Sequence, residues 1–286
     1  MRTDEAARAA KGEAARAGGM ARVRIGIVGW NYPEWRGGVY AEKAKPADFL
    51  AQYARAFPLV EAASAAYGMP KREVVARWAE ATPAEFEMSL KIPGWILQKR
   101  LDDPDVPRAL RLLLDRLEPL RERGKLGALV AQFHPSFRFD KKADQLAALL
   151  RALPEGPRWA VELRHESWWR EETYETLRSA GVTLVWSELA DGFRTPPVAT
   201  TGSLYVRLFG DRALEPPYDR KRRDATATLA HWAERLRTAA PAVERIDVLV
   251  SKYLEGYAPG SARTLAQMLG VDLRGPAAAP ELARDA

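Results

Sequence analysis

Eight short apolar segments recur along the chain, and most neighbouring pairs are separated by enough residues for one helix. Their length and aliphatic content are typical of buried strands. The segments are residues 24–28, 59–61, 86–91, 128–132, 159–163, 183–186, 204–208 and 247–251. Apolar stripes at helical spacing lie between them, at Leu110, Leu113, Leu114 and Leu117, at Leu146, Leu149, Leu150 and Leu153, and at Leu229, Trp232, Ala233 and Leu236. Eight strands alternating with helices predict a parallel sheet closed into a single α/β (β/α)8 barrel of the TIM type.

An open doubly wound sheet is the alternative fold with the same alternation. Its dinucleotide-binding form places Gly-x-Gly-x-x-Gly after the first strand, whereas this chain continues with Gly-Trp-Asn-Tyr at residues 29–32. We therefore predict one barrel domain over residues 21–272. Its sixth unit is expected to be irregular, because residues 187–201 contain Pro196 and Pro197 and lack an amphipathic helical pattern.

Both ends of the chain lack the large apolar side chains that a packed core requires. Residues 1–20 consist mainly of alanine, arginine, glycine and glutamate, and we expect a disordered N-terminal tail. Residues 273–286 are rich in alanine and proline, and we expect a flexible C-terminal tail. Met20 is an alternative start to Met1, because the first strand follows it directly.

The composition is that of an ordinary globular protein, with 47% hydrophobic and 29% charged residues. No apolar run approaches the roughly 20 residues that cross a bilayer, so no membrane association is expected. The chain has no cysteine and no secretory signal, which favours a cytoplasmic protein. Its net charge of +6 favours anionic partners if the charge is concentrated, but carries no such meaning if it is spread over the surface.

In barrels of this type the functional site lies at the C-terminal ends of the strands. The fifth strand ends in Glu162 and Arg164, which alternation places on one face. Glu162, Glu61 and His165 are the candidate catalytic residues, since carboxyl and imidazole groups can transfer protons. The alternative for His165 is a hydrogen-bonded loop residue. Three histidines without cysteine give no recognisable ligand set, so no metal site is predicted and any cofactor stays unidentified.

Three cations at strand ends, Lys91, Arg164 and Arg207, are candidates for holding a carboxylate or phosphate. The structural alternative pairs the charges internally. Glu162 would then pair with Arg164 or Lys91, and Glu61 with Arg207, in buried networks that stabilise this end of the barrel.

The remaining ligand-binding candidates are polar or aromatic residues that follow the strands. They are Trp30, Tyr32, Tyr67, Gln132, Trp168 and Lys252. The tryptophans suit stacking on a sugar or base, and core packing is their structural alternative. The basic run Arg220–Arg223, together with Arg212, follows the seventh strand, where barrels often bind phosphate. A solvated loop is the alternative for this run.

Four blocks of the sequence resemble the YecE-like family, which is catalogued as a domain of unknown function. They are residues 29–37, Val60–Glu61 with Tyr67 and Pro70, Val161–Trp168, and Tyr205–Arg207 with Gly210. The resemblance covers about residues 23–270. It implies a TIM-type barrel.

The chain departs from the family pattern at three places. Alanines stand between Glu61 and Tyr67 where the family usually has an asparagine and a threonine. Ile96–Leu97 occupies the place of a Thr-His pair, and Ser251–Lys252 that of the usual asparagines. The resemblance therefore identifies a divergent member, for which the activity of ordinary members is not implied.

These features lead to three hypotheses. The first is a barrel that binds or converts a small anionic or phosphorylated ligand at its C-terminal mouth. The second is a nucleic-acid-binding or nucleic-acid-processing barrel, suggested by the net charge, the Arg220–Arg223 run and the tryptophans. The third is a catalytically degenerate barrel that senses a ligand, suggested by the departures from the family. Substrate, reaction and oligomeric state stay open.

Overall fold

The computed structural model describes residues 21–63, 68–189 and 192–273. The tail predicted over residues 1–20 lies outside these ranges, and so does all of the predicted C-terminal tail except Leu273. The candidate Tyr67 also lies outside the described residues.

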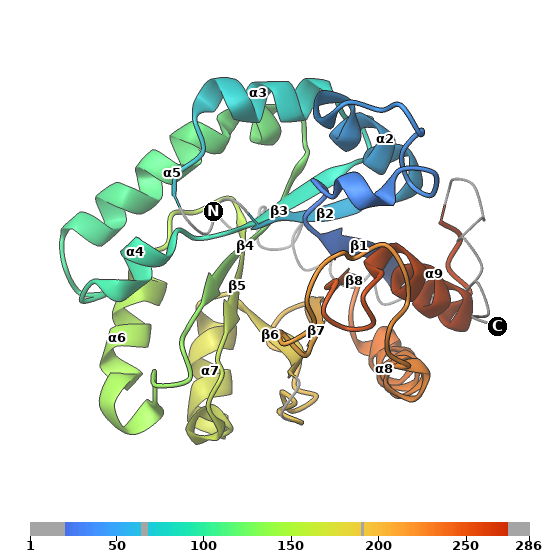
Figure 1. Cartoon of the computed structure of the whole chain (residues 1–286). Helices are drawn as coiled ribbons and strands as arrows, with labels where there is room; N and C mark the ends of the chain where they lie inside the picture. The colour runs from blue at the N-terminus through green and yellow to red at the C-terminus, as the bar shows by residue number, and fades with distance from the viewer. Residues whose placement is uncertain (1–20, 64–67, 190–191, 274–286) are drawn as a thin grey trace, which may run out of the picture.

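Eight parallel strands close into a barrel in which each strand pairs with its sequence neighbours and β8 pairs with β1 (Figure 1). The strands are β1 (Arg22–Val28), β2 (Leu59–Ala62), β3 (Glu87–Lys91), β4 (Leu126–Gln132), β5 (Arg158–Glu162), β6 (Thr183–Leu189), β7 (Ser203–Gly210) and β8 (Arg245–Val250). The register between β1 and β8 runs from Arg22 opposite Arg245 to Ile27 opposite Val250. This pairing confirms the predicted barrel and excludes the open sheet.

Helices surround the barrel on its outer face (Figure 1). They are α2 (Phe49–Ala56), α3 (Arg72–Glu80), α4 (Gly94–Gln98), α5 (Asp105–Glu122), α6 (Phe139–Ala152), α7 (Glu171–Ser179), α8 (Thr226–Ala239) and α9 (Ala258–Leu269). The predicted stripes lie in α5, α6 and α8, where Leu113, Leu149 and Trp232 are fully buried. Helix α4 was not predicted, because five residues are too few to show a periodicity. None of the described helices is both long and apolar enough to cross a membrane.

The core has two parts on opposite faces of the strands. The larger part lies between the barrel and its helices, and a smaller part, which includes Leu59, Val130 and Leu249, fills the barrel interior. Alternation along the strands produces this division, because successive side chains point to opposite faces. The interior apolar layer separates polar side chains at the two ends of the barrel.

The sixth crossover contains no helix among its described residues 192–202. An extended segment covers β6 instead. The backbone N–H of Ser187 donates to the Thr195 hydroxyl at 3.2 Å, and the Trp186 indole donates to the Val198 carbonyl at 2.9 Å. The predicted irregularity of this unit is therefore confirmed.

Candidate functional site

A cluster of fully buried charge occupies the C-terminal end of the barrel. Glu61 from β2, Glu162 from β5 and Arg207 from β7 all have side chains that are 0% exposed. Arg207 Nη2 lies 2.7 Å from Glu61 Oε1, and its Nη1 donates to Glu162 Oε2. The hydroxyl of Tyr205, which precedes Arg207 on the same face of β7, donates to Glu61 Oε2 at 3.0 Å. One guanidinium therefore joins two carboxylates that burial would otherwise make very unfavourable.

Three half-buried side chains continue this network toward the solvent. Arg164 Nε donates to Glu162 Oε1 at 2.7 Å, and Gln132 Nε2 donates to Glu162 Oε2 at 3.0 Å. Lys91 Nζ donates to Gln132 Oε1 at 3.0 Å. We call the six side chains the mouth cluster. Its members are Glu61, Lys91, Gln132, Glu162, Arg164 and Arg207.

Burial and charge act on the mouth cluster in opposite senses. Burial would raise the pKa of Glu162, but the neighbouring Arg207 and Arg164 outweigh it and hold that pKa below its usual range. Burial lowers the pKa of Lys91, and the positive charge of Arg207 lowers it further, against the opposing effect of Glu61 and Glu162. Glu162 is therefore ionised at neutral pH, and the amine form of Lys91 is more accessible than in water.

The ring of Phe209 lies beneath three guanidinium groups. The Arg207, Arg164 and Arg212 Cζ atoms lie 4.3, 5.9 and 5.7 Å from the ring centroid. Arg212 is exposed and has no ion pair within the described residues. Alternation along β7 places Phe209 on the same interior face as Tyr205 and Arg207. The sequence did not point to Phe209 as a site residue, because an apolar ring alone gives no functional signal.

His165 does not join the mouth cluster. Its Nδ1 lies 2.9 Å from the Ser167 hydroxyl and accepts the Ser167 backbone N–H at 3.1 Å, capping the short 3-10 turn Glu166–Trp168. This is the loop position of the structural alternative. Trp168 is 1% exposed, stacks on Phe137 at 5.3 Å and donates its indole N–H to the Phe137 carbonyl. The structure therefore gives both residues local structural contacts.

Lys252 lies in a second group at the rim, after β8. Its Nζ is 4.2, 4.9 and 5.1 Å from the ring centroids of Tyr218, Tyr32 and Tyr253. Burial lowers the pKa of Lys252, against the raising effect of Glu34. The charge of Lys252 is therefore stabilised by aromatic faces.

Trp30 and Tyr32 lie where the chain leaves β1. Trp30 packs edge-to-face against Trp78 with the ring centroids 5.5 Å apart. The Tyr32 hydroxyl donates to the Val28 carbonyl at 3.1 Å. Both side chains are only partly buried, so each combines packing with a surface at the rim.

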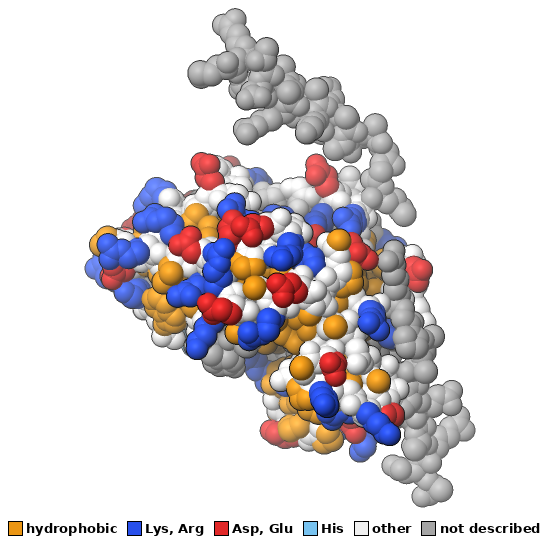
Figure 2. All heavy atoms as spheres, turned by 90° about the horizontal axis from the view of Figure 1, so that it is seen from above, with side chains coloured by type: hydrophobic (Ala, Val, Ile, Leu, Met, Phe, Trp, Pro, Cys, Tyr) orange, Lys and Arg blue, Asp and Glu red, His pale blue; other side chains and the backbone are white. Residues whose placement is uncertain are grey.

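The basic run Arg220–Arg223 is paired within its own surroundings. Lys221 Nζ lies 2.9 Å from the buried Glu255 carboxylate, and Arg223 Nη1 lies 3.0 Å from Asp211 Oδ2. On the face seen in Figure 2, basic and acidic side chains are interspersed, and no field of one sign forms there. These contacts fit a structured loop.

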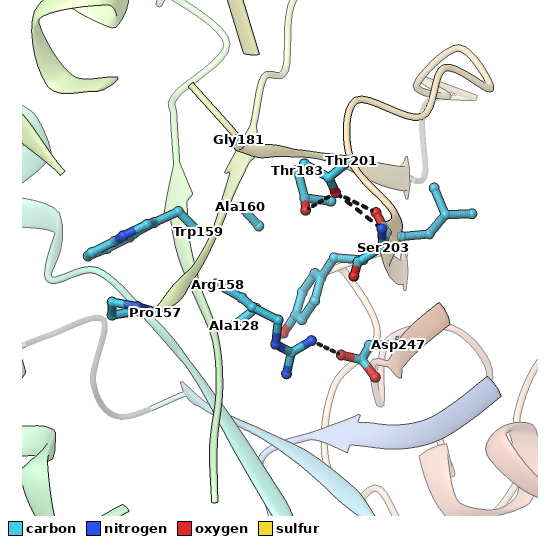
Figure 3. A pocket seen from close by; sticks show the side chains of 12 residues that line it. Ala128, Pro157, Arg158, Trp159, Ala160, Gly181, Thr183, Thr201, Ser203 and Asp247 are labelled. Atoms are coloured by element: carbon cyan, nitrogen blue, oxygen red, sulfur yellow. Dashed lines mark hydrogen bonds and ion pairs between the residues drawn. The ribbon is translucent and has the colours of Figure 1, made fainter. Parts of the chain in front are cut away.

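A second ion network lies at the N-terminal end of the barrel. Arg158 bridges Asp247 at 3.0 Å and Glu87 at 2.6 Å, and Arg245 contacts both of the same acids. A cavity of about 160 Å³ opens beside Arg158 (Figure 3). The hydroxyl groups of Thr183 and Thr201, which line this cavity, are hydrogen-bonded to each other with 2.8 Å between their oxygens. In barrel enzymes this end is associated with stability, while chemistry takes place at the opposite end.

The described histidine and acidic side chains form no group of three or more that could hold a metal ion. The mouth cluster instead combines ionised carboxylates with guanidinium, amine and amide donors. Such a set can bind an anion without a metal.

The sequence matches the family described as "Protein of unknown function DUF72" over residues 24–284. The chain belongs to this family. The UPF0759 protein YecE of Escherichia coli K12 is 29% identical to it over 165 residues. That match covers 56% of the chain and 55% of YecE, so the aligned part spans about half the length of each protein.

Solved DUF72 structures share the fold. A DUF72 protein from Thermotoga maritima is 30% identical, with a TM-score of 0.72 over 87% of this chain and 99% of that one. A DUF72 protein from Enterococcus faecalis is 22% identical, with a TM-score of 0.72 over 89% of this chain and 98% of that one. The resemblance to the YecE-like family is thus confirmed.

Two of the three departures from the DUF72 pattern lie apart from the mouth cluster. Ile96 is fully buried in α4, and Lys252 is held among three tyrosine rings. Among the described residues, no hydrogen bond or ion pair joins Lys252 to Glu61, Glu162 or Arg207. Most of the substituted stretch between Glu61 and Tyr67 lies outside the described residues.

Proposed function

We propose that the C-terminal mouth of this DUF72 barrel binds a small anionic ligand that carries a carboxylate or a phosphate. The observation that carries the proposal is an unbalanced charge. Four cations, Lys91, Arg164, Arg207 and Arg212, gather around Phe209 and the mouth cluster. Within the described part of the chain, Glu61 and Glu162 are the only acids that form ion pairs with them. An excess of two positive charges favours an anion most strongly where solvent is partly excluded.

The donors that remain free are on the cations. All four carboxylate oxygens of Glu61 and Glu162 already accept a hydrogen bond from Arg164, Arg207, Tyr205 or Gln132. Lys91 has one bond to a neutral amide, and Arg212 has no ion pair among the described residues. In this proposal Lys91 and Arg212 contact the ligand, and a modest movement brings in the unpartnered Nη2 of Arg164.

This arrangement changes the roles expected for the acidic residues. Glu162 is held ionised by two guanidinium groups, so it is a poor proton donor at neutral pH. In the proposal Glu61 and Glu162 are positioning residues that fix Arg207 and Arg164. His165 and Trp168 are left out, because their side chains are engaged by Ser167 and Phe137.

A small ligand is favoured over a nucleic acid by the pairing of the basic run. The cations that a phosphate backbone would need, Lys221 and Arg223, are engaged by Glu255 and Asp211.

We also place the protein in the cytoplasm, because the chain contains no cysteine for disulfides and the relatives described above are bacterial. Rim aromatics such as Trp30 and Tyr32 would border the bound ligand.

Thermal unfolding in the presence of candidate anions tests the proposal. A ligand at 100 times its dissociation constant stabilises a protein by about 2.7 kcal/mol, so inorganic phosphate, pyruvate and glycerol 3-phosphate can be compared with chloride at equal ionic strength. At least one should raise the melting temperature, and Lys91→Met and Arg212→Met should reduce that shift.

The matched control is Arg237→Met, which removes one positive charge at the far end of α8, where the side chain is 52% exposed. It should keep the full shift. If the control lost the shift as the mouth variants do, the effect would be one of net charge and the site would be wrong.

A further inference from the structure

We propose that Lys91 is an amine nucleophile and that the anionic ligand also carries a carbonyl group, with which Lys91 forms an iminium. The inference rests on the proposed anion site and names the substrate class of that site. Small 2-oxo acids and phosphorylated ketones have the required combination of groups.

The first support is the pairing pattern of the mouth cluster. Its two carboxylates are taken by Arg207 and Arg164, and the nearest partner of Lys91 is the amide oxygen of Gln132 at 3.0 Å. Lys91 is thus the one cation of the mouth cluster without an ion pair in the described structure. An ammonium paired with a carboxylate resists deprotonation more strongly than one that donates only to a neutral amide.

The second support is the surrounding charge. Arg207 and Arg164 lie near the Lys91 amine, and burial and the charge of Arg207 lower its pKa, as for lysines that act as nucleophiles in partly desolvated sites beside another cation. Lys91 is half-buried, so part of its side chain remains in contact with solvent.

The third support is the spacing of the amine and the anion holders. Lys91 ends β3, and Arg164 follows β5, with β4 between them. Adjacent strands are about 4.8 Å apart, so β3 and β5 are separated by roughly 10 Å, which lysine and arginine side chains can span from both sides. Arg164 or Arg212 would hold the anionic group, and Lys91 would meet the carbonyl carbon.

The chemical step balances without a redox partner. The lone pair of the neutral Lys91 amine attacks the carbonyl carbon, and the π electrons move to the oxygen, which takes a proton from solvent. The nitrogen, which now carries two protons and a positive charge, passes one proton to the hydroxyl group. That group leaves as water, and the freed nitrogen lone pair forms the C=N bond of the iminium. One amine, one carbonyl compound and one proton thus give one iminium and one water.

Borohydride trapping in the full-length protein tests the inference. The probes are two matched pairs that differ in the carbonyl group, pyruvate with lactate and dihydroxyacetone phosphate with glycerol 3-phosphate. Borohydride delivers hydride to the iminium carbon and leaves a stable secondary amine. Intact mass and peptide mapping should show a gain equal to the carbonyl compound less one oxygen atom, located on Lys91.

Two variants distinguish the role of Lys91 as a nucleophile from its role as a positive charge. Lys91→Arg keeps the positive charge and should abolish trapping while the melting shift with lactate or glycerol 3-phosphate persists. The matched control, Lys99→Arg, changes a lysine whose Nζ is 3.3 Å from Asp105 and should trap as the wild type does. Peptide mapping of the borohydride-reduced wild-type protein locates the modified lysine without any variant, so the test can still be made if Lys91→Arg does not fold.

The outcomes distinguish the two proposals. Melting shifts with both members of a pair, without a covalent product or with label on another lysine, would overturn the amine role and leave the anion site standing. No shift and no product with any of the four compounds would overturn both.

Discussion

The replacement Arg207→Met probes the mouth cluster at its centre. The guanidinium contacts Glu61 and Glu162, and all three side chains are 0% exposed. Methionine approximates the length of the arginine stem but removes the charge and all donors. Both carboxylates then lose a partner in a place that solvent does not reach.

Removing one partner of a buried ion pair costs about 3–5 kcal/mol, because the remaining charge is left unpaired. Since Arg207 serves two carboxylates, we expect the upper part of that range. With about 2–4 °C per kcal/mol for domains of this size, a loss of about 4–5 kcal/mol should lower the melting temperature by roughly 8–20 °C. Adding Glu61→Gln and Glu162→Gln to Arg207→Met should recover part of the loss.

Chemical denaturation across a pH series is the assay. In the variant, burial of Glu162 is opposed by fewer positive charges, so its folded-state pKa rises above the unfolded value. Stability relative to the wild type should then improve as the pH falls from 8 toward 5. Arg212→Met, the exposed arginine over the same Phe209 ring, is the control and should cost less than about 1 kcal/mol. A cost for Arg207→Met as small as that of the control would refute this view of the cluster.

Three further replacements test the barrel packing, the role of Trp168 and the charge of Glu162. A Cβ at position 26 would lie 2.0 Å from the Leu59 carbonyl oxygen, so Gly26→Ala should lower the free energy of unfolding by about 3 kcal/mol or more in denaturant titrations. In Gly68→Ala the added Cβ would meet no atom of the described residues within 4 Å, and the free energy should change by less than about 0.5 kcal/mol. Trp168→Ala should cost about 3–5 kcal/mol yet leave ligand affinity in calorimetry unchanged; a selective loss of affinity would contradict its packing role. The folded-state pKa of Glu162 is below its usual 4.5, so in acid the unfolded chain binds more protons than the folded protein and the free energy of unfolding falls below that pH. Glu162→Gln should make this loss of stability with falling pH shallower, and an unchanged slope would contradict the low pKa.

The barrel was predictable because its pattern is repeated and local. Each strand carries its own apolar run, and the helix stripes in α5, α6 and α8 need no knowledge of distant residues. Strand ends differ from the prediction by up to three residues, as at β6, which continues to Leu189. Pairing with the next strand decides those ends, and one segment alone does not contain that information.

The members of the site were easier to predict than their partners. Alternation at strand ends indicated Glu61, Lys91, Glu162 and Arg207, but the sequence left open whether these charges pair internally. The structure decides this point, because Arg207 reaches Glu61 across 146 positions of sequence. His165 shows where prediction from strand position fails. It follows a strand-end acid in the sequence, but its imidazole contacts the hydroxyl of Ser167.

The most direct test of the anion site is anomalous diffraction from crystals of this protein soaked in selenate or tungstate. We expect an anomalous peak at the C-terminal mouth from an oxyanion with an oxygen within about 3.2 Å of Lys91 Nζ or an Arg212 nitrogen, and no such peak in Lys91→Met/Arg212→Met crystals. Peaks found only elsewhere on the surface, or a mouth peak that persists in the double variant, would contradict this expectation.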